Sequence, residues 1–372
     1  MTTRRQVLTQ SAGVIAGLTL AGCSGLDTAQ ITAQMRMPQR PADGYRLPIR
    51  VGGKLVRTID VHAHCLIPQA LAMMGADANG VLPPVKGQQE HFIVIEDRLA
   101  AMDAMGIDME VLSINPFWYR RDRIVAAEIV RIQNQKMSEL CAARPDRFSA
   151  FASLALQFPD LAIEQLEQAM KLPGIRGVAI GGSVAGDEFS DPKFHPVWER
   201  AQALGAVLFI HPQSTPELAK RFRGNGWMSN VIGNPLDTTI ALQHLIYEGV
   251  LDKFPDLKIC AAHGGGYVGS NAPRMDVSCF VSPQNCNPAI VLKKKPSEYI
   301  RQIYFDALVF TPEALRHLVA DVGVSQVVLG TDHPIPWEQH PVDHVMATPM
   351  LSDADRIAIL GGNAKRMLGL KD

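Results

Sequence analysis

The stretch "TIDVHAHCLIP", from Thr58 to Pro68, reads as a short buried strand that carries two histidines one residue apart. Side chains alternate between the two faces of a strand, so His62 and His64 point the same way. If the strand belongs to an α/β barrel, its C-terminal end opens onto the mouth, where such folds carry their sites. The pair alone leaves two readings open, a shared metal ion or a satisfied structural pair.

Seven further apolar runs with strand character follow the first, which spans Thr58–His62, and helical patterns separate them. They are Met109–Ile114, Phe148–Leu154, Gly177–Ile180, Val207–His211, Lys258–His263, Ile303–Val309 and Val327–Asp332. This alternation predicts a parallel sheet closed as a (β/α)8 TIM barrel. A doubly wound open sheet is the alternative, but no glycine-rich phosphate loop follows the first strand.

Two of the helical segments have recognisable ends. "DLAIEQLEQAMKLPG" predicts a helix from a cap at Asp160 to the Pro173-Gly174 pair. "TPEALRHLVADVG" predicts one that begins at Pro312 after a Thr311 cap and stops at Gly323.

Two connections are too long for simple loops. Residues 66–96 follow the first strand and residues 212–235 follow the fifth. Long connections in a compact domain are often lids or small subdomains, so we expect a small insertion after the first strand.

Polar side chains also end three other predicted strands. "VLFIHP" ends on His211, "KICAAHGGG" on His263 and "VVLGTDHP" on Asp332. Imidazoles and a carboxylate converging at one mouth suit a borderline metal such as zinc, with one position left for water or substrate. For each residue alone, a buried hydrogen-bonded role in the core is the alternative.

The composition is that of an ordinary globular chain. Of 372 residues 47% are hydrophobic and 20% charged, and the formal net charge is −1. This balance gives no basic stripe for nucleic acid, so we expect no nucleic-acid partner. Beyond the N-terminal segment, no apolar run has transmembrane length.

The N-terminus has the pattern of an export signal. Arg4 and Arg5 precede the apolar run "VIAGLTLAG" and then Cys23. The paired arginines resemble a twin-arginine signal, and "LAGC" resembles a lipobox in which the cysteine is lipidated. We expect a signal peptide over residues 1–22, lipidation at Cys23, a tether over 24–53 and the barrel domain over 54–372. The protein would be a periplasmic or cell-envelope lipoprotein that contacts the membrane only through this anchor; a disordered tail is the alternative.

Cysteine usage leaves one question open. Without Cys23 five cysteines remain, and Cys279 and Cys286 lie close together in one loop. They form either a disulfide in an oxidising compartment or two reduced thiols.

The chain as a whole resembles a known family. Its His-x-His on the first strand, later strand-end histidines and final aspartate are similar to the amidohydrolase superfamily pattern. The segments "AAHGGG", "LGTDHP", "NPLDTTIA", "GVLDKFPDLKIC" and "YFDAL" resemble its decarboxylase branch, typified by aminocarboxymuconate-semialdehyde and gamma-resorcylate decarboxylases. The likeness covers residues 58–370.

The resemblance implies a role for each strand-end residue. His62, His64, His211 and Asp332 would be the metal ligands, and His263 the acid/base group beside the metal, with Asp332 sharing in proton handling. Superfamily members with two metals carry a bridging ligand on the fourth strand, but "RGVAIGGS" offers no Lys, Glu or Cys. We therefore expect one divalent metal, zinc or alternatively manganese, and the family implies a homodimer.

The resemblance favours a metal-dependent, non-oxidative decarboxylase (carboxy-lyase) acting on a small carboxylic acid, aromatic or muconate-like. Hydrolysis of a lactone or amide on the same site is one alternative, because metal-bound water could be activated there. A non-catalytic lipoprotein that binds metal or a ligand is another.

Four residues are candidates for substrate binding. Arg274 lies where related decarboxylases place an arginine for the substrate carboxylate, with a surface salt bridge as the alternative. Phe117 and Trp118, after the second strand, would line a pocket or pack in the core, and Trp227 would belong to a lid. Two further arginines of the carboxymuconate enzyme have no convincing counterpart. The segment "HFIVIED" offers no arginine before Arg98, and the other position falls near Ser282.

Overall fold

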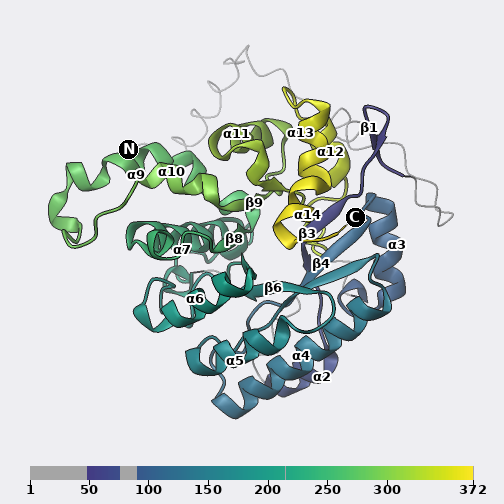
Figure 1. Cartoon of the computed structure of the whole chain (residues 1–372), viewed down its shortest axis with the longest axis horizontal. Helices are drawn as coiled ribbons and strands as arrows, with labels where there is room; N and C mark the ends of the chain where they lie inside the picture. Colours follow the sequence, from purple (N-terminus) through teal and green to yellow (C-terminus); the bar gives the residue numbers. More distant parts are fainter. Residues whose placement is uncertain (1–47, 76–89, 214, 372) are drawn as a thin grey trace, which may run out of the picture. The chain divides into compact units, whose positions relative to one another are not determined.

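The protein is described here by a computed structural model, which covers residues 48–75, 90–213 and 215–371. Eight parallel strands follow one another around the sheet in chain order, from β3 to β10 (Figure 1). Their bounds are β3 Ile59–His64, β4 Met109–Ser113, β5 Phe148–Ala152, β6 Ile175–Ile180, β7 Val207–Ile210, β8 Lys258–Ala261, β9 Tyr304–Asp306 and β10 Val327–Val328. All eight predicted strands are present, most of them shorter than the apolar runs that predicted them.

The sheet closes between its first and last strands. Ala63 forms a parallel bridge with His333, and the amide of Val61 donates to the carbonyl of Leu329 at 2.9 Å. Helices surround the strands, as Figure 1 shows. The predicted (β/α)8 TIM barrel is therefore confirmed.

The helices alternate with the strands along the chain. Their bounds are α2 Pro68–Met73, α3 Ile95–Met105, α4 Arg123–Ala143, α5 Pro159–Ala169, α6 His195–Leu204, α7 Asn234–Tyr247, α8 Val250–Lys253, α9 Val268–Val281, α10 Pro296–Tyr299, α11 Pro312–Val322, α12 Pro341–Ala347, α13 Asp353–Ile357 and α14 Asn363–Leu368. No helix in the described residues is long and apolar enough to cross a membrane.

Apolar residues form two core clusters. The larger lies between strands and helices and includes Trp118 and Trp198. The smaller joins residues from strands right around the barrel, such as Val111 and Phe209, to Met367 of α14, which places it inside the barrel. The ring of Phe209 lies 5.2 Å from that of His62, so the strand-end histidines rest directly on this inner core.

Both long connections carry short elements. The insertion after β3 contains α2 and a 3-10 turn, η2 (Glu90–Phe92), and its residues 76–89 lie outside the described part. The segment after β7 contains η4 (Pro216–Leu218) and a π-helical turn, η5 (Ser229–Gly233), which leads into α7. The described parts of the insertion predicted after the first strand, α2 and η2, thus follow the C-terminal end of β3.

Residues near the predicted domain boundary at 54 also have regular structure. The strands β1 (Arg50–Val51) and β2 (Lys54–Leu55) pair as an antiparallel hairpin across it. The predicted signal peptide, Cys23 and most of the tether lie outside the described residues.

The open question on cysteines has an answer in this structure. Cys279, near the end of α9, is bonded to Cys286 by a disulfide; Cys286 follows the 3-10 turn η7 (Pro283–Asn285).

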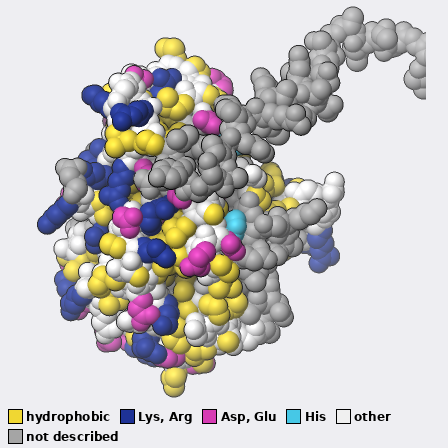
Figure 2. Space-filling view, turned by 90° about the vertical axis from the view of Figure 1, so that its right-hand side faces the viewer, with side chains coloured by type: hydrophobic (Ala, Val, Ile, Leu, Met, Phe, Trp, Pro, Cys, Tyr) yellow, Lys and Arg dark blue, Asp and Glu magenta, His cyan; other side chains and the backbone are white. Residues whose placement is uncertain are grey.

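On the face drawn in Figure 2, basic and acidic side chains are interspersed, in keeping with the net charge of −1.

Candidate metal centre

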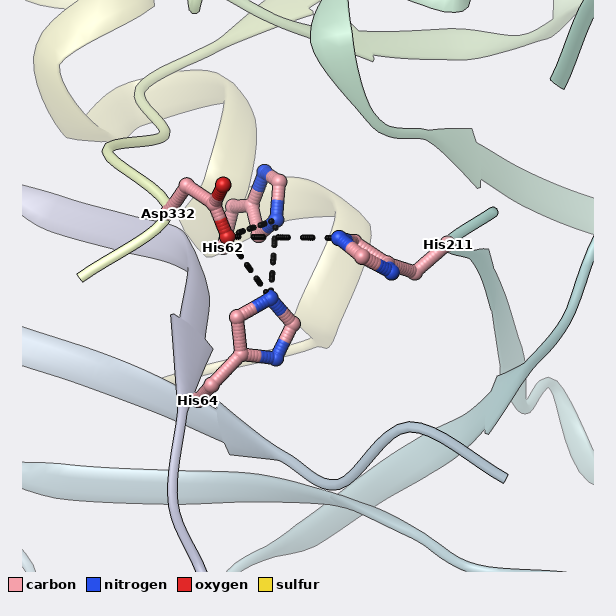
Figure 3. A group of neighbouring side chains, drawn as sticks. All are labelled: His62, His64, His211 and Asp332. Atoms are coloured by element: carbon pink, nitrogen blue, oxygen red, sulfur yellow. Dashed lines mark hydrogen bonds and ion pairs between the residues drawn. The ribbon is translucent and has the colours of Figure 1, made fainter. Parts of the chain in front are cut away.

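The structure brings the four predicted metal ligands together at the barrel mouth (Figure 3). His62 and His64 come from β3, His211 directly follows β7, and Asp332 follows β10. All four are buried, and one ligand atom from each lies within 4.8 Å of the others. Asp332 Oδ1 lies 3.1 Å from His62 Nε2 and 2.8 Å from His64 Nε2. His211 Nε2 approaches the same oxygen from the other side of the group, at 3.9 Å.

Neighbouring side chains leave one nitrogen of each β3 histidine free for a metal. His62 Nδ1 lies 2.6 Å from Asp306 Oδ2 and donates its hydrogen there, so Nε2 is the nitrogen that faces the other ligands. His64 Nδ1 lies 3.2 Å from the Ser113 hydroxyl oxygen, which can accept in the same way. Partners of this kind commonly orient metal-bound imidazoles.

His211 has no such partner. Both of its ring nitrogens are buried and have no hydrogen-bond partner within the described residues. A buried imidazole without a partner is costly unless something else binds it. With the free nitrogens of His62 and His64 and the Asp332 carboxylate, this orphaned ring fits a divalent metal ion.

The charges of the site also suit a metal. Burial lowers the pKa of His211 well below its ordinary value, and the neighbouring imidazoles lower it further. Burial likewise lowers the pKa of His64, so both rings are neutral and able to act as ligands. Burial alone would raise the pKa of Asp332, but His62, His263 and His64 together hold it well below the ordinary range.

His62 differs from the other two because it lies between two carboxylates. Burial opposes its charged form, yet Asp332 and Asp306 outweigh that effect and raise its pKa to about 10. Without a metal, the site therefore holds a proton on His62. A divalent cation would displace this proton, so binding should release it to solvent.

The predicted acid/base residue lies beside the ligand group. His263 follows β8 with a left-handed φ of 56°, and its Nε2 lies 3.7 Å from Asp332 Oδ2. Its ring centroid is 5.1 Å from that of His62 and 5.2 Å from that of His211. His263 Nδ1 has no hydrogen-bond partner among the described residues. This ring is thus placed to exchange a proton with a molecule bound at the ligand group.

Asp306 was not among the predicted site residues. This fully buried carboxylate at the end of β9 accepts from His62 Nδ1 at 2.6 Å, and from the amides of His263 at 2.9 Å and Gly264 at 2.8 Å. It therefore positions a ligand and the acid/base loop at once. The signal was available, because "YFDAL" puts an acidic residue at a strand end like the other site residues.

Gly330 allows the last strand to approach the site closely. A Cβ at this position would lie 2.6 Å from the Asp306 Cβ and 3.0 Å from the His62 Cβ. Any larger residue would push apart the strands that carry Asp332, Asp306 and His62. The glycine of "LGTDHP" is thus a packing requirement of the site.

The four candidate substrate-binding residues have different surroundings. Trp118 is buried and its indole donates to the Leu154 carbonyl at 2.8 Å, while Phe117 is half-buried against the core. Trp227 is 41% exposed and stacks on Trp337 with centroids 5.7 Å apart. Arg274 lies on α9 and is exposed, without a hydrogen bond or ion pair to any residue that the structure describes. None of the four hydrogen-bonds or stacks with the ligands within the described residues.

The chain belongs to the amidohydrolase family, whose sequence pattern it matches over residues 59–370. It is 32% identical, over 276 residues, to a 2-amino-3-carboxymuconate-6-semialdehyde decarboxylase from Dictyostelium discoideum, covering 73% of this chain and 76% of the relative. It is 29% identical, over 328 residues, to a gamma-resorcylate decarboxylase from Rhizobium sp., covering 84% of this chain and 98% of that protein.

A solved structure with a bound metal shares the fold. A dihydroxybenzoic acid decarboxylase from Polaromonas sp., with bound manganese and the inhibitor 2-nitroresorcinol, superposes with a TM-score of 0.75 at 26% identity. The match covers 85% of this chain and 97% of the other. These findings confirm the expected resemblance to the superfamily and to its decarboxylase branch.

Proposed function

We propose that this protein is a metal-dependent, non-oxidative decarboxylase of a small carboxylic acid, aromatic or muconate-like. The observation that carries the proposal is the buried group of three histidines and one aspartate, with His263 beside it. The relatives over most of the chain are decarboxylases of such acids. The absence of a Lys, Glu or Cys after β6, where Gly181 and Gly182 lie, supports a site for a single metal.

The chemistry follows from the residues at the site. A divalent cation held by the four ligands would supply positive charge to bind acidic substrate oxygens. His263, beside the ligand group, is the residue placed to donate a proton to the carbon that loses its carboxylate. The carbon–carbon bond breaks, its electron pair stays on the ring or chain carbon, carbon dioxide leaves, and the proton fills the vacated position. Asp332 Oδ2, 3.7 Å from His263 Nε2, orients that ring.

The test is a product assay. The purified, metal-loaded protein is incubated with 2,6-dihydroxybenzoate, 5-carboxyvanillate and aminocarboxymuconate semialdehyde, together with lactones, and the product masses are read. Loss of carbon dioxide from one of the acids is expected. Addition of water to a lactone would instead make the enzyme a hydrolase, with Asp332 accepting the proton of water.

A variant separates the role of His263 from metal binding. His263→Asn should keep the metal content of the wild type and lose at least about 100-fold in kcat, because the proton donor is gone. Loss of metal in this variant would contradict the assignment.

For the metal itself we propose zinc. Three imidazoles and one carboxylate form a nitrogen-rich set that suits zinc, whereas the Polaromonas relative holds manganese. Metal analysis of protein grown without added metal, followed by activity after reloading with each ion, distinguishes the two.

We also propose a homodimer that uses the end of α9. Val277, Phe280 and Val281 on this helix are 49%, 87% and 73% exposed. Substrate-binding roles are proposed separately from the dimer. Arg274, on the same helix, would bind a substrate carboxylate, and Phe117 and Trp227 would contact the substrate from the loops after β4 and β7. Phe280→Glu should give a monomer in sedimentation analysis, whereas a wild-type monomer would contradict the proposal.

Export with lipidation at Cys23 is likewise proposed, on the N-terminal sequence pattern. The Cys279–Cys286 disulfide supports an oxidising compartment. Mass spectrometry of the N-terminal peptide from membranes should find a diacylated cysteine, and Cys23→Ala should release the protein from the membrane fraction.

A further inference from the structure

The barrel is closed by a seam between β10 and β3 whose backbone pairing is less regular than that of the other strands. The seven other neighbouring pairs form ladders, whereas here the described residues show a single bridge, between Ala63 and His333. β10 is only two residues long, Val327–Val328, and the chain beyond it runs beside β3 without regular pairing. Side chains that reach both sides of the seam therefore add to its backbone hydrogen bonds, such as that from Val61 to Leu329.

Three of the four metal ligands come from the two sides of this seam. His62 and His64 lie on β3, and Asp332 lies on the chain that follows β10. The amide of Asp332 donates to the His62 carbonyl at 2.8 Å, and the amide of His64 donates to the His333 carbonyl at 2.6 Å. A shift of one side along the other would change the distances between ligand atoms, which a metal tolerates only within a few tenths of an ångström.

A buried ionic group spans the seam directly behind these ligands. Glu110 on β4 is fully buried; its Oε2 lies 2.5 Å from Arg98 Nε and its Oε1 lies 2.7 Å from His333 Nδ1. Arg98, on α3 and only 1% exposed, also donates from Nη1 to the backbone carbonyl of His64 at 2.6 Å. One carboxylate and one guanidinium thus join α3 and β4 to both sides of the seam.

Stability alone does not explain these charges. Burying an ion pair costs much of what the pair gains, and well-packed apolar residues of similar volume often stabilise a fold equally well or better. What the ionic group adds is direction, because the planar guanidinium and the carboxylate hold their partners in a defined geometry. The guanidinium binds Glu110 and the backbone carbonyls of His64 and His91, and the carboxylate binds Arg98 and His333. Among these partners are the carbonyl of one metal ligand, His64, and the residue next to another, His333.

We propose that Arg98, Glu110 and His333 are positioning residues that hold His64 and Asp332 at the spacing required by the metal. The proposal rests on the metal centre and is independent of which reaction occurs there. None of the three belongs to the group of four candidate ligands. Their effect is therefore expected in metal affinity first and in turnover only as a consequence.

The test replaces the charges by apolar side chains of similar size. Glu110→Gln alone would leave a buried guanidinium without its counter-charge, so we use the double variant Arg98→Met with Glu110→Met, and separately His333→Phe. Metal affinity is measured by competition with a chelator, and the melting temperature of the metal-free protein is measured alongside. We expect a fall of about 10–100-fold in metal affinity, with little change in the melting temperature of the metal-free protein.

A matched control lies elsewhere in the same barrel. Arg147 and Asp103 also form a partly buried ion pair, at 2.7 Å, that reaches α3, but Arg147 Nε donates to the Asp108 carbonyl before β4 and touches no residue of the seam. Asp103→Leu with Arg147→Met should leave metal affinity unchanged. Wild-type affinity in the folded Arg98/Glu110 and His333 variants would overturn the proposal, as would an equal loss in the control. Because turnover is not measured, failure here is distinct from failure of the decarboxylase assignment.

Discussion

The metal site is prepared residue by residue through hydrogen bonds to the far side of each imidazole. Asp306 engages His62 Nδ1 and Ser113 lies beside His64 Nδ1, so both rings present Nε2 to the centre of the group. His211 has no such partner among the described residues. These three histidines should therefore respond differently to substitution, although all three are expected to bind the same ion.

Replacing His211 should affect the metal and not the metal-free fold. The His211→Leu variant removes a buried ring without partners and puts an apolar side chain in its place, so the melting temperature of the metal-free protein should not fall. His62→Leu, in contrast, leaves Asp306 and Asp332 without their shared partner and should cost about 3–5 kcal/mol in the free energy of unfolding. Both variants should lose the metal. Calorimetry of the chelator-treated proteins gives the comparison, and equal destabilisation would contradict it.

Asp306 should be sensitive to the loss of a single oxygen. Its Oδ2 accepts from His62 Nδ1 and the His263 amide, and its Oδ1 accepts from the amides of Gly264 and Leu308. The amide nitrogen of Asp306→Asn cannot accept, so two of these bonds are lost whichever way the side chain turns. We expect a loss of about 3 kcal/mol in urea unfolding and weaker metal binding. An unchanged urea midpoint would show that Asp306 is not the anchor described here.

At the scale of single elements, helix ends were predicted with mixed success. Thr311 caps α11, accepting from the Ala314 amide at 3.1 Å, and the helix runs from Pro312 to Val322 as expected. α5, however, begins at Pro159, one residue before its predicted cap. Asp160 lies in the first turn and pairs with Arg123 of α4 at 2.6 Å. The Asp160 carboxylate therefore pairs with Arg123 of α4 instead of capping α5 as the local sequence pattern predicted.

The first turn of α7 carries a buried carboxylate that makes stability depend on pH. Burial raises the pKa of Asp237 from 3.8 to about 7. The backbone amide of Gln213, which donates to Asp237 Oδ2 at 2.9 Å, opposes this rise but is outweighed by burial. The folded protein therefore binds this proton more tightly than the unfolded chain, and its contribution to stability falls as pH rises from about 4 to about 7.

Asp237→Asn removes this dependence. Between about pH 4 and pH 7 the wild type loses stability, because its folded state must release the proton of Asp237, whereas the variant has no such proton. The free energy of unfolding of the variant, relative to that of the wild type, should therefore increase over this range and stay constant above about pH 7. The difference in urea midpoint between variant and wild type, measured at pH 5 and pH 8, checks the sign. A difference that shrinks as pH rises would contradict the prediction.

At the scale of the whole molecule, we expect the fold not to depend on the metal. Two apolar clusters fill the barrel and the space between strands and helices. Metal at about 1,000 times its dissociation constant should add about 4 kcal/mol to the stability of the folded state.

A chelator should therefore lower the melting temperature by about 10 °C and leave the far-ultraviolet circular dichroism at room temperature unchanged. A melting temperature insensitive to chelator would mean that the four ligands hold no metal. Loss of helical signal would mean that the metal is needed to fold the barrel.

Much of the architecture was predictable from local patterns. Apolar runs of strand length alternate with helical periodicity, and this alternation specified eight parallel strands before any contact was known. The four ligands were predictable for a related reason, since polar residues at strand ends meet at the mouth of any such barrel. The resemblance to the decarboxylase branch then assigned them roles.

Other features depend on contacts between distant parts of the chain. Asp306 and His62 are 244 residues apart, and Arg98 reaches the His64 carbonyl from a helix beyond the insertion. Nothing in the neighbourhood of Arg98 or Glu110 in the sequence indicates that they are buried, because charged residues on helices and strands are usually solvated.

By itself, the sequence determined the strand order, the barrel and the residue types at its mouth, because hydrophobic periodicity and strand-end polarity act over a few residues. Only the tertiary structure decided which nitrogen each histidine presents, that His211 is left without a partner, and that a buried ion pair lies behind the ligands. These properties arise where polar atoms from elements far apart in the chain, such as His62 Nδ1 and Asp306 Oδ2, come within hydrogen-bonding distance in the buried interior. There each polar atom must find a partner.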